Sequence, residues 1–374
     1  MEAAQVIVLA TPVFLLLIAV EYAVGVARGR NTYRLNDALN SIGLGILSQL
    51  TGVFTKLMTV GIYTVVHRHA ALRALPADAW WVWVGALLLY DFCYYWNHRL
   101  GHECALFWAA HVVHHQSEDY NLSTALRQTS TGWIAGWIFY LPMAVLGVPP
   151  VVFATVALID LLYQFWVHTQ QVGRLGWFDR VFCSPSNHRV HHAVNDRYLD
   201  RNYGGILVLW DRLFGTFQEE DEREPCVYGT RSPLRSWNPI RANLQVYAEL
   251  VRDSWHTARW SDKLRVWLKP PGWRPADVAA RFPKPAFDLR QVTRYDPPMG
   301  RGAQWAAAVL FLLLLGATAW WLWQAHALSP GALAGGALAI TAGLWVVGQL
   351  CSGTPAASGS EAASQAAGAA ASGR

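Results

Sequence analysis

Nine of the thirteen histidines in this chain fall into four groups, and the spacing within each group is that of one helix face. Residues three or four positions apart lie on the same side of a helix, so each multi-histidine group can direct its imidazoles to one point. Imidazole binds iron, zinc, copper and nickel, and nine such ligands are more than one ion needs. The sequence therefore predicts a metal cluster, most simply a binuclear one. In chain order the groups are His98 and His102; His111, His114 and His115; His168; and His188, His191 and His192.

A surface tract, a structural zinc site and a metal transporter each account for these histidines less well. A histidine-rich surface tract is usually contiguous and of low complexity, whereas these groups extend over residues 98–192 within varied, aromatic-rich sequence. A structural zinc site is four-coordinate and usually includes cysteine. A metal transporter or store would carry ligands along a path inside the membrane spans, but these histidines follow the ends of apolar segments. A binuclear iron site that activates dioxygen fits best, because oxidation of an unactivated carbon needs a redox metal with open positions.

The composition is that of a membrane protein. Of 374 residues, 53% are hydrophobic and only 15% are charged, the mean hydropathy is positive, and 20 residues are tryptophan. Soluble domains have about a quarter charged residues, and tryptophan is enriched at the level of lipid headgroups. The formal charge of +5 comes from dispersed basic residues, which favour attraction to anionic lipid over nucleic-acid binding. The five cysteines share no repeating spacing, so we expect neither a disulfide framework nor a thiolate metal site.

Apolar segments approaching the roughly 20 residues that cross the hydrocarbon core divide the chain. We expect spans at residues 5–26, 80–96, 133–148, 151–167, 305–323 and 328–350, and a span or re-entrant segment at 42–66. Pro149 and Pro150 predict a tight turn between two of these, a helical hairpin that returns His168 to the side of the other histidines. Because basic residues favour the cytoplasm, the arginines after the first span place the amino terminus outside and all four histidine groups inside.

These boundaries predict five regions. They are N-terminal membrane segments (1–78), a di-iron core with four histidine groups and the hairpin (79–217), a cytoplasmic or interfacial region (218–302), a C-terminal membrane hairpin (303–351) and a disordered, low-complexity tail (352–374). Trp255, Trp260 and Trp267 predict an amphipathic helix lying in the membrane interface, with a partner-docking face as the alternative. The expected fold class is an all-α integral membrane protein: a transmembrane helix bundle with a cytoplasmic histidine-rich helical cap.

Two acids within apolar segments could support the cluster. Asp91 precedes His98 by two helical turns, and Asp160 precedes His168 at the same face. An acid inside a span is costly and functional by default, and a ligand histidine usually donates its other N–H to an acceptor. We therefore expect Asp91 and Asp160 to orient histidines without binding metal. The alternative for each is a place at a helix end or in a water-filled gap.

Three further acids follow histidine groups directly. Glu103 comes after His102, and Glu118 and Asp119 follow the second group. They could be ligands, hydrogen-bond acceptors or contacts to a cationic cofactor. The alternative for Glu103 is an ion pair with a nearby arginine, and for Glu118 and Asp119 it is a solvated helix end.

The residues around the histidines resemble the fatty acid hydroxylase/sterol desaturase superfamily of membrane di-iron oxygenases. The order of the groups and the hairpin before the lone histidine carry the resemblance, together with long runs between histidines over residues 91–217. The runs are Tyr-Trp-Asn-His-Arg (95–99), His-His-Gln-Ser-Glu-Asp-Tyr-Asn-Leu-Ser-Thr-Ala-Leu-Arg-Gln (114–128), Leu-Tyr-Gln-Phe-Trp-Val-His-Thr (162–169), Ser-Pro-Ser-Asn-His-Arg-Val-His-His (184–192), Asn-Tyr-Gly-Gly (202–205) and Trp-Asp-Arg-Leu-Phe-Gly-Thr-Phe (210–217).

The resemblance implies a monooxygenase that holds two irons per chain and uses O2 to place one oxygen atom in a lipid C–H bond. Within the superfamily the similarity is to the branch that acts on ether lipids. That branch implies the carbon beside the ether oxygen of an alkylglycerol lipid as target and tetrahydrobiopterin as reductant, with Glu103 as its candidate contact. The alternative is a hydroxylase or desaturase of an acyl chain, sterol or carotenoid that takes electrons from a donor protein.

Two departures from the superfamily pattern leave the ligand set open. Asn187 stands where relatives often carry another histidine, so an amide oxygen, a water or nothing would complete that position. Val172 stands where the hydroxylase branches carry a second histidine after the lone one. The Ala-rich, Arg-over-Lys composition favours a bacterial inner membrane, with the metal site facing the cytoplasm.

Overall fold

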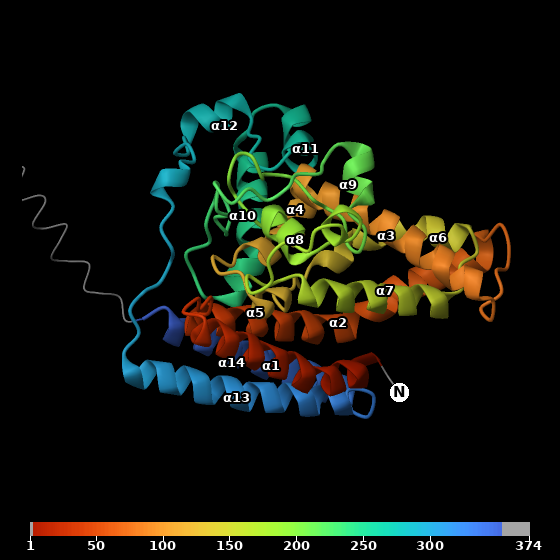
Figure 1. The fold of residues 1–374 in the computed structure, drawn as a ribbon, viewed down its shortest axis with the longest axis horizontal. Coiled ribbons are helices and arrows are strands. Elements are labelled where there is room, and N and C mark those ends of the chain that lie inside the picture. The colour runs from red at the N-terminus through yellow and green to blue at the C-terminus, as the bar shows by residue number, and fades with distance from the viewer. Residues whose placement is uncertain (1–2, 354–374) are drawn as a thin grey trace, which may run out of the picture.

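The computed structural model describes residues 3–353, and its regular structure over that range is helical (Figure 1). Extended pairing in those residues is limited to two isolated bridges, Phe182 with Leu207 and Ala193 with Tyr228. The all-α class predicted from the sequence is thus confirmed, while the predicted tail lies almost wholly outside the described residues. The α-helices are α1 (Ala3–Ala27), α2 (Leu35–Ala70), α3 (Trp80–Glu103), α4 (Ala105–His115), α5 (Leu122–Ala125), α6 (Leu141–Val145), α7 (Pro150–Trp166), α8 (Pro185–His191), α9 (Leu209–Phe214), α10 (Pro239–His256), α11 (Trp260–Leu268), α12 (Ala276–Arg281), α13 (Arg301–Gln324) and α14 (Pro330–Cys351).

Four of these helices are long and apolar enough to cross a membrane: α1, the first part of α2, α13 and α14. They run alongside one another through the lower half of Figure 1. Half of the apolar window of α2 is buried but only 6% of that of α1. Helix α2 is therefore the central element of this bundle, and α1 is an outer wall whose side chains face lipid.

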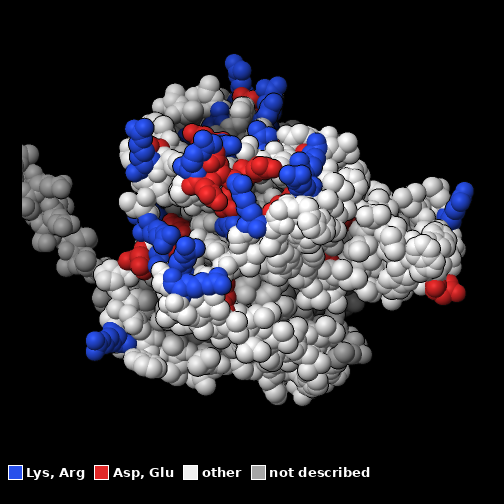
Figure 2. Space-filling model, viewed as in Figure 1, with Lys and Arg blue, Asp and Glu red and all other residues white. Residues whose placement is uncertain are grey.

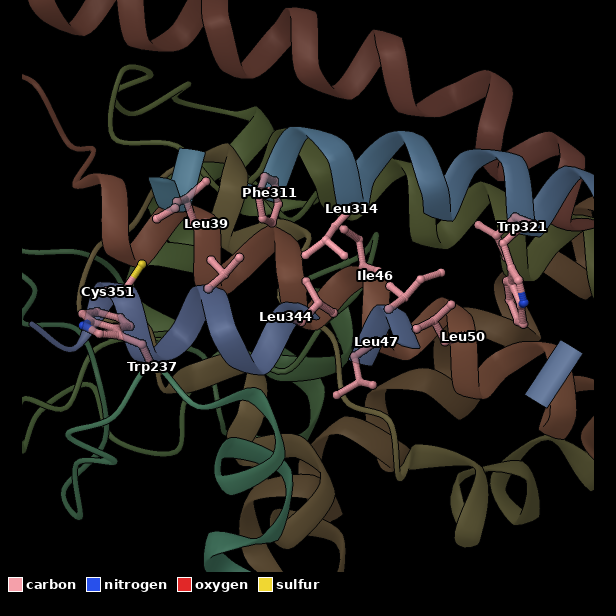
Figure 3. Close-up of a cluster of buried hydrophobic side chains, with 14 residues drawn as sticks. Leu39, Ile46, Leu47, Leu50, Trp237, Phe311, Leu314, Trp321, Leu344 and Cys351 are labelled. Atoms are coloured by element: carbon pink, nitrogen blue, oxygen red, sulfur yellow. The ribbon is translucent and has the colours of Figure 1, made fainter. Parts of the chain in front are cut away.

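A cluster of buried apolar side chains fastens α13 and α14 to α2. Figure 3 shows Ile46 and Leu50 of α2 beside Leu314 and Trp321 of α13, with Leu344 of α14 completing the layer. A second cluster joins the other half of α2 to α3, α6 and α7. Helix α2 thus belongs to both apolar clusters and connects the outer bundle to the helices that carry histidines.

The predicted helical hairpin is only half correct. Its second arm is α7, but residues 133–148 do not form a continuous span: they comprise 3₁₀ turns at Gly132–Ile134 and Gly136–Tyr140 and the short helix α6. Two glycines and Pro142 weaken a helix at this place. The segment packs against α2 and α3, and Leu72 N–H donates to the carbonyl of Val145 (2.8 Å). Irregular backbone at membrane depth is tolerated where protein surrounds it.

The remaining helices form a cap over one side of the spans. Helices α4 and α8–α12 lie in the upper part of Figure 1, and most charged side chains on the face in Figure 2 gather over that part. The surface of the bundle below is almost uncharged in the same view. This division between a charged cap and an apolar bundle agrees with the predicted architecture.

Candidate metal centre

All nine histidines predicted as ligands come together, and they form two adjoining groups. Within each group the candidate ligand atoms lie within 4.8 Å of one another. The rings of His115 and His192 stack across the boundary, with centroids 4.2 Å apart. The first group is His98, His102, His111, His115 and His191, and the second is His114, His168, His188 and His192.

Four helices bring their carboxyl-terminal ends to the cluster. The histidines lie in the last two turns of α3 and α4, two residues beyond the end of α7, and at the end of the short helix α8. Helix α8 begins where Ser184 caps the N–H of Asn187 and Pro185 takes the first helical position. The end of a helix carries partial negative charge, which favours a cation at that place.

Backbone carbonyls orient four of the rings. Because a carbonyl oxygen can only accept, each bonded Nδ1 carries the hydrogen, and the Nε2 of the neutral ring presents a lone pair. The Nδ1 donors and their acceptors are His98 to Tyr203 (2.8 Å), His114 to Arg127 (2.9 Å), His168 to Gln164 (2.7 Å) and His191 to Arg201 (3.0 Å).

The Nε2 atoms then face one another at short range. Those of His114 and His168 are 3.1 Å apart. Both rings hold their hydrogen on Nδ1, so two lone pairs meet there without a proton between them. Neighbouring Nε2 atoms elsewhere in the cluster are 3.0–3.2 Å apart, and Nε2 of His102 is buried with no hydrogen-bond partner among residues 3–353. A cation among the nitrogens would remove this repulsion, so the donor set fits a metal.

The close pairs of nitrogens have the spacing of two ligands of one ion. Two nitrogens about 2.1 Å from the same ion lie about 3.0–3.4 Å apart, and the close Nε2 pairs of the cluster lie 3.0–3.2 Å apart. Burial keeps these rings neutral: it lowers the pKa of His114 to about 4, and it lowers the pKa of His115, His188 and His192 well below the usual range.

Asp91 does not contact a histidine, contrary to the sequence-based expectation. Its carboxylate accepts from the backbone N–H groups of Ile206 (2.7 Å) and Leu207 (3.1 Å) and from the indole of Trp210 (2.9 Å). Asp91 therefore holds the loop at 203–207, whose Tyr203 carbonyl orients His98. Asp91 acts on the cluster through that loop, because its two carboxylate oxygens accept hydrogen bonds from residues 206–210 and not from a histidine.

A buried acid that the sequence reasoning missed holds the same loop from the other side. Asp211 accepts from the N–H groups of Tyr203 (2.7 Å) and Gly204 (2.8 Å), and burial raises its pKa to about 6. The loop passes so close to the acids that a Cβ on Gly205 would lie 2.6 Å from Asp160 Oδ1 and 3.0 Å from Asp91 Oδ1. Only glycine fits this position.

Asp160 also has no direct contact with His168, the histidine that it was predicted to orient; Gln164 links the two. Its Oδ2 accepts from the side-chain amide of Gln164 (2.5 Å), and the backbone carbonyl of Gln164 accepts from His168. The amide oxygen of Gln164 in turn accepts from the Tyr94 hydroxyl (2.6 Å). The predicted four-residue ladder on α7 therefore exists, but Gln164 is its contact with histidine.

Asn187 and Glu103 both have partners outside the histidine cluster. The Asn187 amide donates to the carbonyls of Asp179 (2.9 Å) and Phe182 (3.1 Å), which fixes the start of α8 and directs the amide hydrogens away from the cluster. Glu103 pairs with Arg99 one turn earlier (2.9 Å), which is the ion pair named as its alternative.

Glu118 and Asp119 form part of an ion-pair cluster around Arg34. The Nε of Arg34 is 2.7 Å from Asp119, and its Nη2 is 3.9 Å from Glu118. Asp119 is 4% exposed, so neither the predicted ligand role nor the solvated helix end describes it. These acids join the loop after α4 to the beginning of α2.

A cavity of about 610 Å³ leads from the histidines into the membrane bundle. His98, His111, His114 and His168 form part of its wall. Helices α1, α2, α7 and α13 supply a wall that is mostly apolar, including Phe14, Ile46, Leu161 and Ala319. Sequence patterns do not indicate that α1 and α13 line it, because a cavity between distant helices leaves no local signal.

The fold and the histidine cluster define a helical membrane protein with two groups of histidines that could hold metal ions. The sequence model described as fatty acid hydroxylase matches residues 83–216. Alkylglycerol monooxygenase of Homo sapiens is 42% identical over 71% of this chain and 59% of its own length, and that of Xenopus tropicalis is 38% identical over 82% and 68%. Ornithine lipid hydroxylase OlsE of Rhizobium tropici is 30% identical over 35% of this chain and 40% of its own length. This chain belongs to the fatty acid hydroxylase family. No solved structure matches it.

The loop contacts predict a specific defect in metal retention. Asp91→Asn and Asp211→Asn each replace one acceptor oxygen with an amide NH2 group, which only donates, so an N–H of the 203–207 loop loses its partner and the carbonyl that orients His98 shifts. Losing such support typically costs roughly 10–100-fold in metal affinity or activity. Metal content of the purified variants, measured after dialysis against a weak chelator, checks this. Glu103→Gln is the matched control, and equal retention in all three variants would contradict the role of the loop.

Proposed function

We propose that this chain is a membrane di-iron monooxygenase that uses O2 to hydroxylate a lipid C–H bond. The observation that carries the proposal is the cavity that joins the histidines to the apolar faces of α1 and α13. A lipid chain can enter from the bilayer and place one of its carbons at the cluster without crossing water. A water-soluble substrate would gain little binding energy from a wall that is mostly apolar.

The two histidine groups support a count of two metal ions per chain. His98, His102, His111, His115 and His191 would hold one ion, and His114, His168, His188 and His192 would hold the other. Bound iron would supply the activation of O2 that carbon–hydrogen oxidation needs. The chain itself orients the nitrogens, excludes water through the apolar wall and positions the lipid.

The target we favour is the carbon beside the ether oxygen of an alkylglycerol lipid. Several relatives that cover most of this chain carry the name alkylglycerol monooxygenase. One oxygen atom of O2 would enter the C–H bond, and the other would leave as water with two protons and two electrons from the reductant. The resulting hemiacetal separates into a fatty aldehyde and a glycerol derivative.

Tetrahydrobiopterin is the reductant that this assignment implies. Glu103 pairs with Arg99 and is not among the residues that line the cavity, so we do not assign it the pterin contact. On the aqueous side of the cluster the buried ring of His102 has its Nδ1 3.4 Å from the half-exposed Asp200. We further propose that this side faces the cytoplasm of a bacterial inner membrane, as the basic residues after α1 indicate.

A second candidate function has its own support. The relative named ornithine lipid hydroxylase indicates that an acyl-chain hydroxylase is compatible with this histidine core. Such an enzyme would take its electrons from a donor protein. The two functions differ in reductant as well as in substrate, and this makes them separable in a purified system.

Metal content provides the first test. Purified without chelators, the parent chain should carry close to two iron ions. His168→Ala should lower the content towards one, because His168 belongs to the second group and its segment supplies no histidine to the first. Elemental analysis with protein quantification measures this. Gln170→Ala is a nearby control outside both groups. A parent content of one ion, unchanged by His168→Ala, would contradict the binuclear assignment.

Choice of reductant provides the second test. Reconstituted protein should consume O2 and convert an alkylglycerol lipid to an aldehyde when tetrahydrobiopterin is supplied. A ferredoxin-like donor should not replace it. Oxygen uptake and product mass are measured for both donors, with an alkylglycerol and an ornithine lipid as substrates. Turnover that needs the protein donor and ignores pterin would reject the alkylglycerol assignment in favour of the acyl-chain hydroxylase.

The cavity provides the third test. Ala319→Trp fills the cavity from α13 at a distance from the histidines, so turnover of long-chain lipids should fall several-fold more than that of short-chain lipids, with unchanged iron content. Ala317→Trp is the matched control, since Ala317 is exposed on the same helix and does not line the cavity. Equal losses of turnover for both variants and both chain lengths would mean that the lipid chain does not bind in this cavity.

A further inference from the structure

Helices α10 and α11 each present a row of large apolar side chains that no other described element covers. On α10 the row recurs at steps of four, seven and four residues, which keeps it within about 60° of one helix face. On α11 it recurs at every fourth residue. The members and their exposed fractions are Ile240 (41%), Leu244 (50%), Val251 (55%) and Trp255 (80%) on α10, and Trp260 (82%), Leu264 (70%) and Leu268 (66%) on α11. We call this the α10–α11 apolar face.

The other sides of both helices are already occupied. Leu250 of α10 and Val266 of α11 are buried in one cluster with Ala105 and Ala109 of α4. The exposed row is therefore not the side that attaches the helices to the cap. Each of the two helices therefore has two apolar sides. One side packs on α4, and the other faces outwards.

The position of α10 relates this face to the bilayer. Helix α10 starts two residues after Trp237, whose carbonyl accepts from Asn40 of α2 (2.7 Å) and lies against Gly348 at the end of α14. In Figure 1 it runs across the direction of α1, α2, α13 and α14. A helix that starts at the ends of spanning helices and runs across them lies along the membrane surface. Tyr247 on α10 also lines the cavity that opens towards α1 and α13.

The charges beside the face match an anionic lipid surface. Arg252, Arg259, Arg265 and Lys269 are exposed on these two helices or at their ends. The acids of the same stretch are paired: Glu249 with Lys284, Asp253 with Arg274, and Asp262 with Arg265. Arg252, Arg259 and Lys269 have no acidic partner among the described residues. Tryptophan near helix ends and basic residues beside an apolar face are typical of helices that lie in the headgroup region. Each basic residue near an anionic surface adds to the attraction.

We propose that the α10–α11 apolar face is a membrane-surface anchor that inserts into the headgroup region of a bilayer containing anionic lipid. The anchor would hold the cap against the same bilayer that the spans cross, and it would keep the mouth of the cavity level with the lipids that enter it. It explains why seven large apolar side chains face outwards from two neighbouring helices of the cap.

The test uses the full chain reconstituted in liposomes of phosphatidylcholine with and without phosphatidylglycerol. A nitroxide is attached at Trp255→Cys or Leu264→Cys in a Cys226→Ser background, because Cys226 is the least buried of the five native thiols. Accessibility to oxygen and to a water-soluble nickel chelate is then measured by electron spin resonance. Glu222→Cys, on an exposed polar part of the cap, is the control. The unmutated background, labelled in parallel, measures reaction at the buried thiols, and metal content shows that each variant folds.

The anchor predicts an oxygen-to-nickel accessibility ratio several-fold higher at positions 255 and 264 than at 222. The ratio should rise further with phosphatidylglycerol, and Arg259→Glu with Lys269→Glu should abolish that rise. Nickel accessibility at 255 and 264 equal to that at 222 would mean that the face is in water and would overturn the proposal. Spin–spin broadening at 255 or 264 that disappears on dilution with unlabelled protein would overturn it too, because the face would then contact a second copy of the chain.

Discussion

The structure depends on holding nine imidazoles with their Nε2 atoms turned towards one another. Between two rings that hold their hydrogen on Nδ1, as His114 and His168 do, this arrangement is repulsive without a cation, so it depends on bonds that hold the opposite side of the rings. Four Nδ1 donors are bonded to carbonyls from four different segments, at Tyr203, Arg127, Gln164 and Arg201. The backbone of the cap is therefore shaped to present carbonyls at these places, and much of the rest of the fold serves to keep those carbonyls still.

Buried ionic side chains fix the segments that carry these carbonyls. Arg127 is 1% exposed, and it donates to the Val113 carbonyl (2.7 Å) and to Asn40 of α2 (2.8 Å) while its own carbonyl orients His114. Glu21 of α1 accepts from Thr169, next to His168, and from the N–H of Leu122. Removing one of these neutral partners leaves a buried charged group unsatisfied, which typically costs more than about 1–3 kcal/mol. The spans and the cap are thus joined by the same polar contacts that set the ring orientations.

The sequence was sufficient to find the histidines that come together and insufficient for what surrounds them. Histidine is rare and its helical spacing is a local property, so all nine members of the cluster could be chosen without any knowledge of the fold. A carbonyl such as that of Tyr203 has no sequence signature, since every residue has one. Asp91 was singled out correctly as a buried acid but given the wrong partner, because helical spacing reports only on its own helix and the donors come from residues 206–210. Asp211 could have been found in the same way, as an acid enclosed by Trp210 and Leu213. The broken segment at 133–148 was misjudged because hydropathy records burial and not helicity.

The two histidine groups are interleaved along the chain. Helix α4 gives His111 and His115 to one group and His114 to the other, and α8 gives His191 to the first and His188 to the second. The separation between the groups is therefore set by the pitch of two short helices and not by any flexible loop. A rotation of either helix would disturb both groups at once, so the pair behaves as one mechanical unit with a fixed internal distance. Because its parts lie as far apart as residues 98 and 192, this unit cannot be assembled until the chain beyond α8 has been made, and α3, α4 and α7 must wait for it with their nitrogens still unpaired.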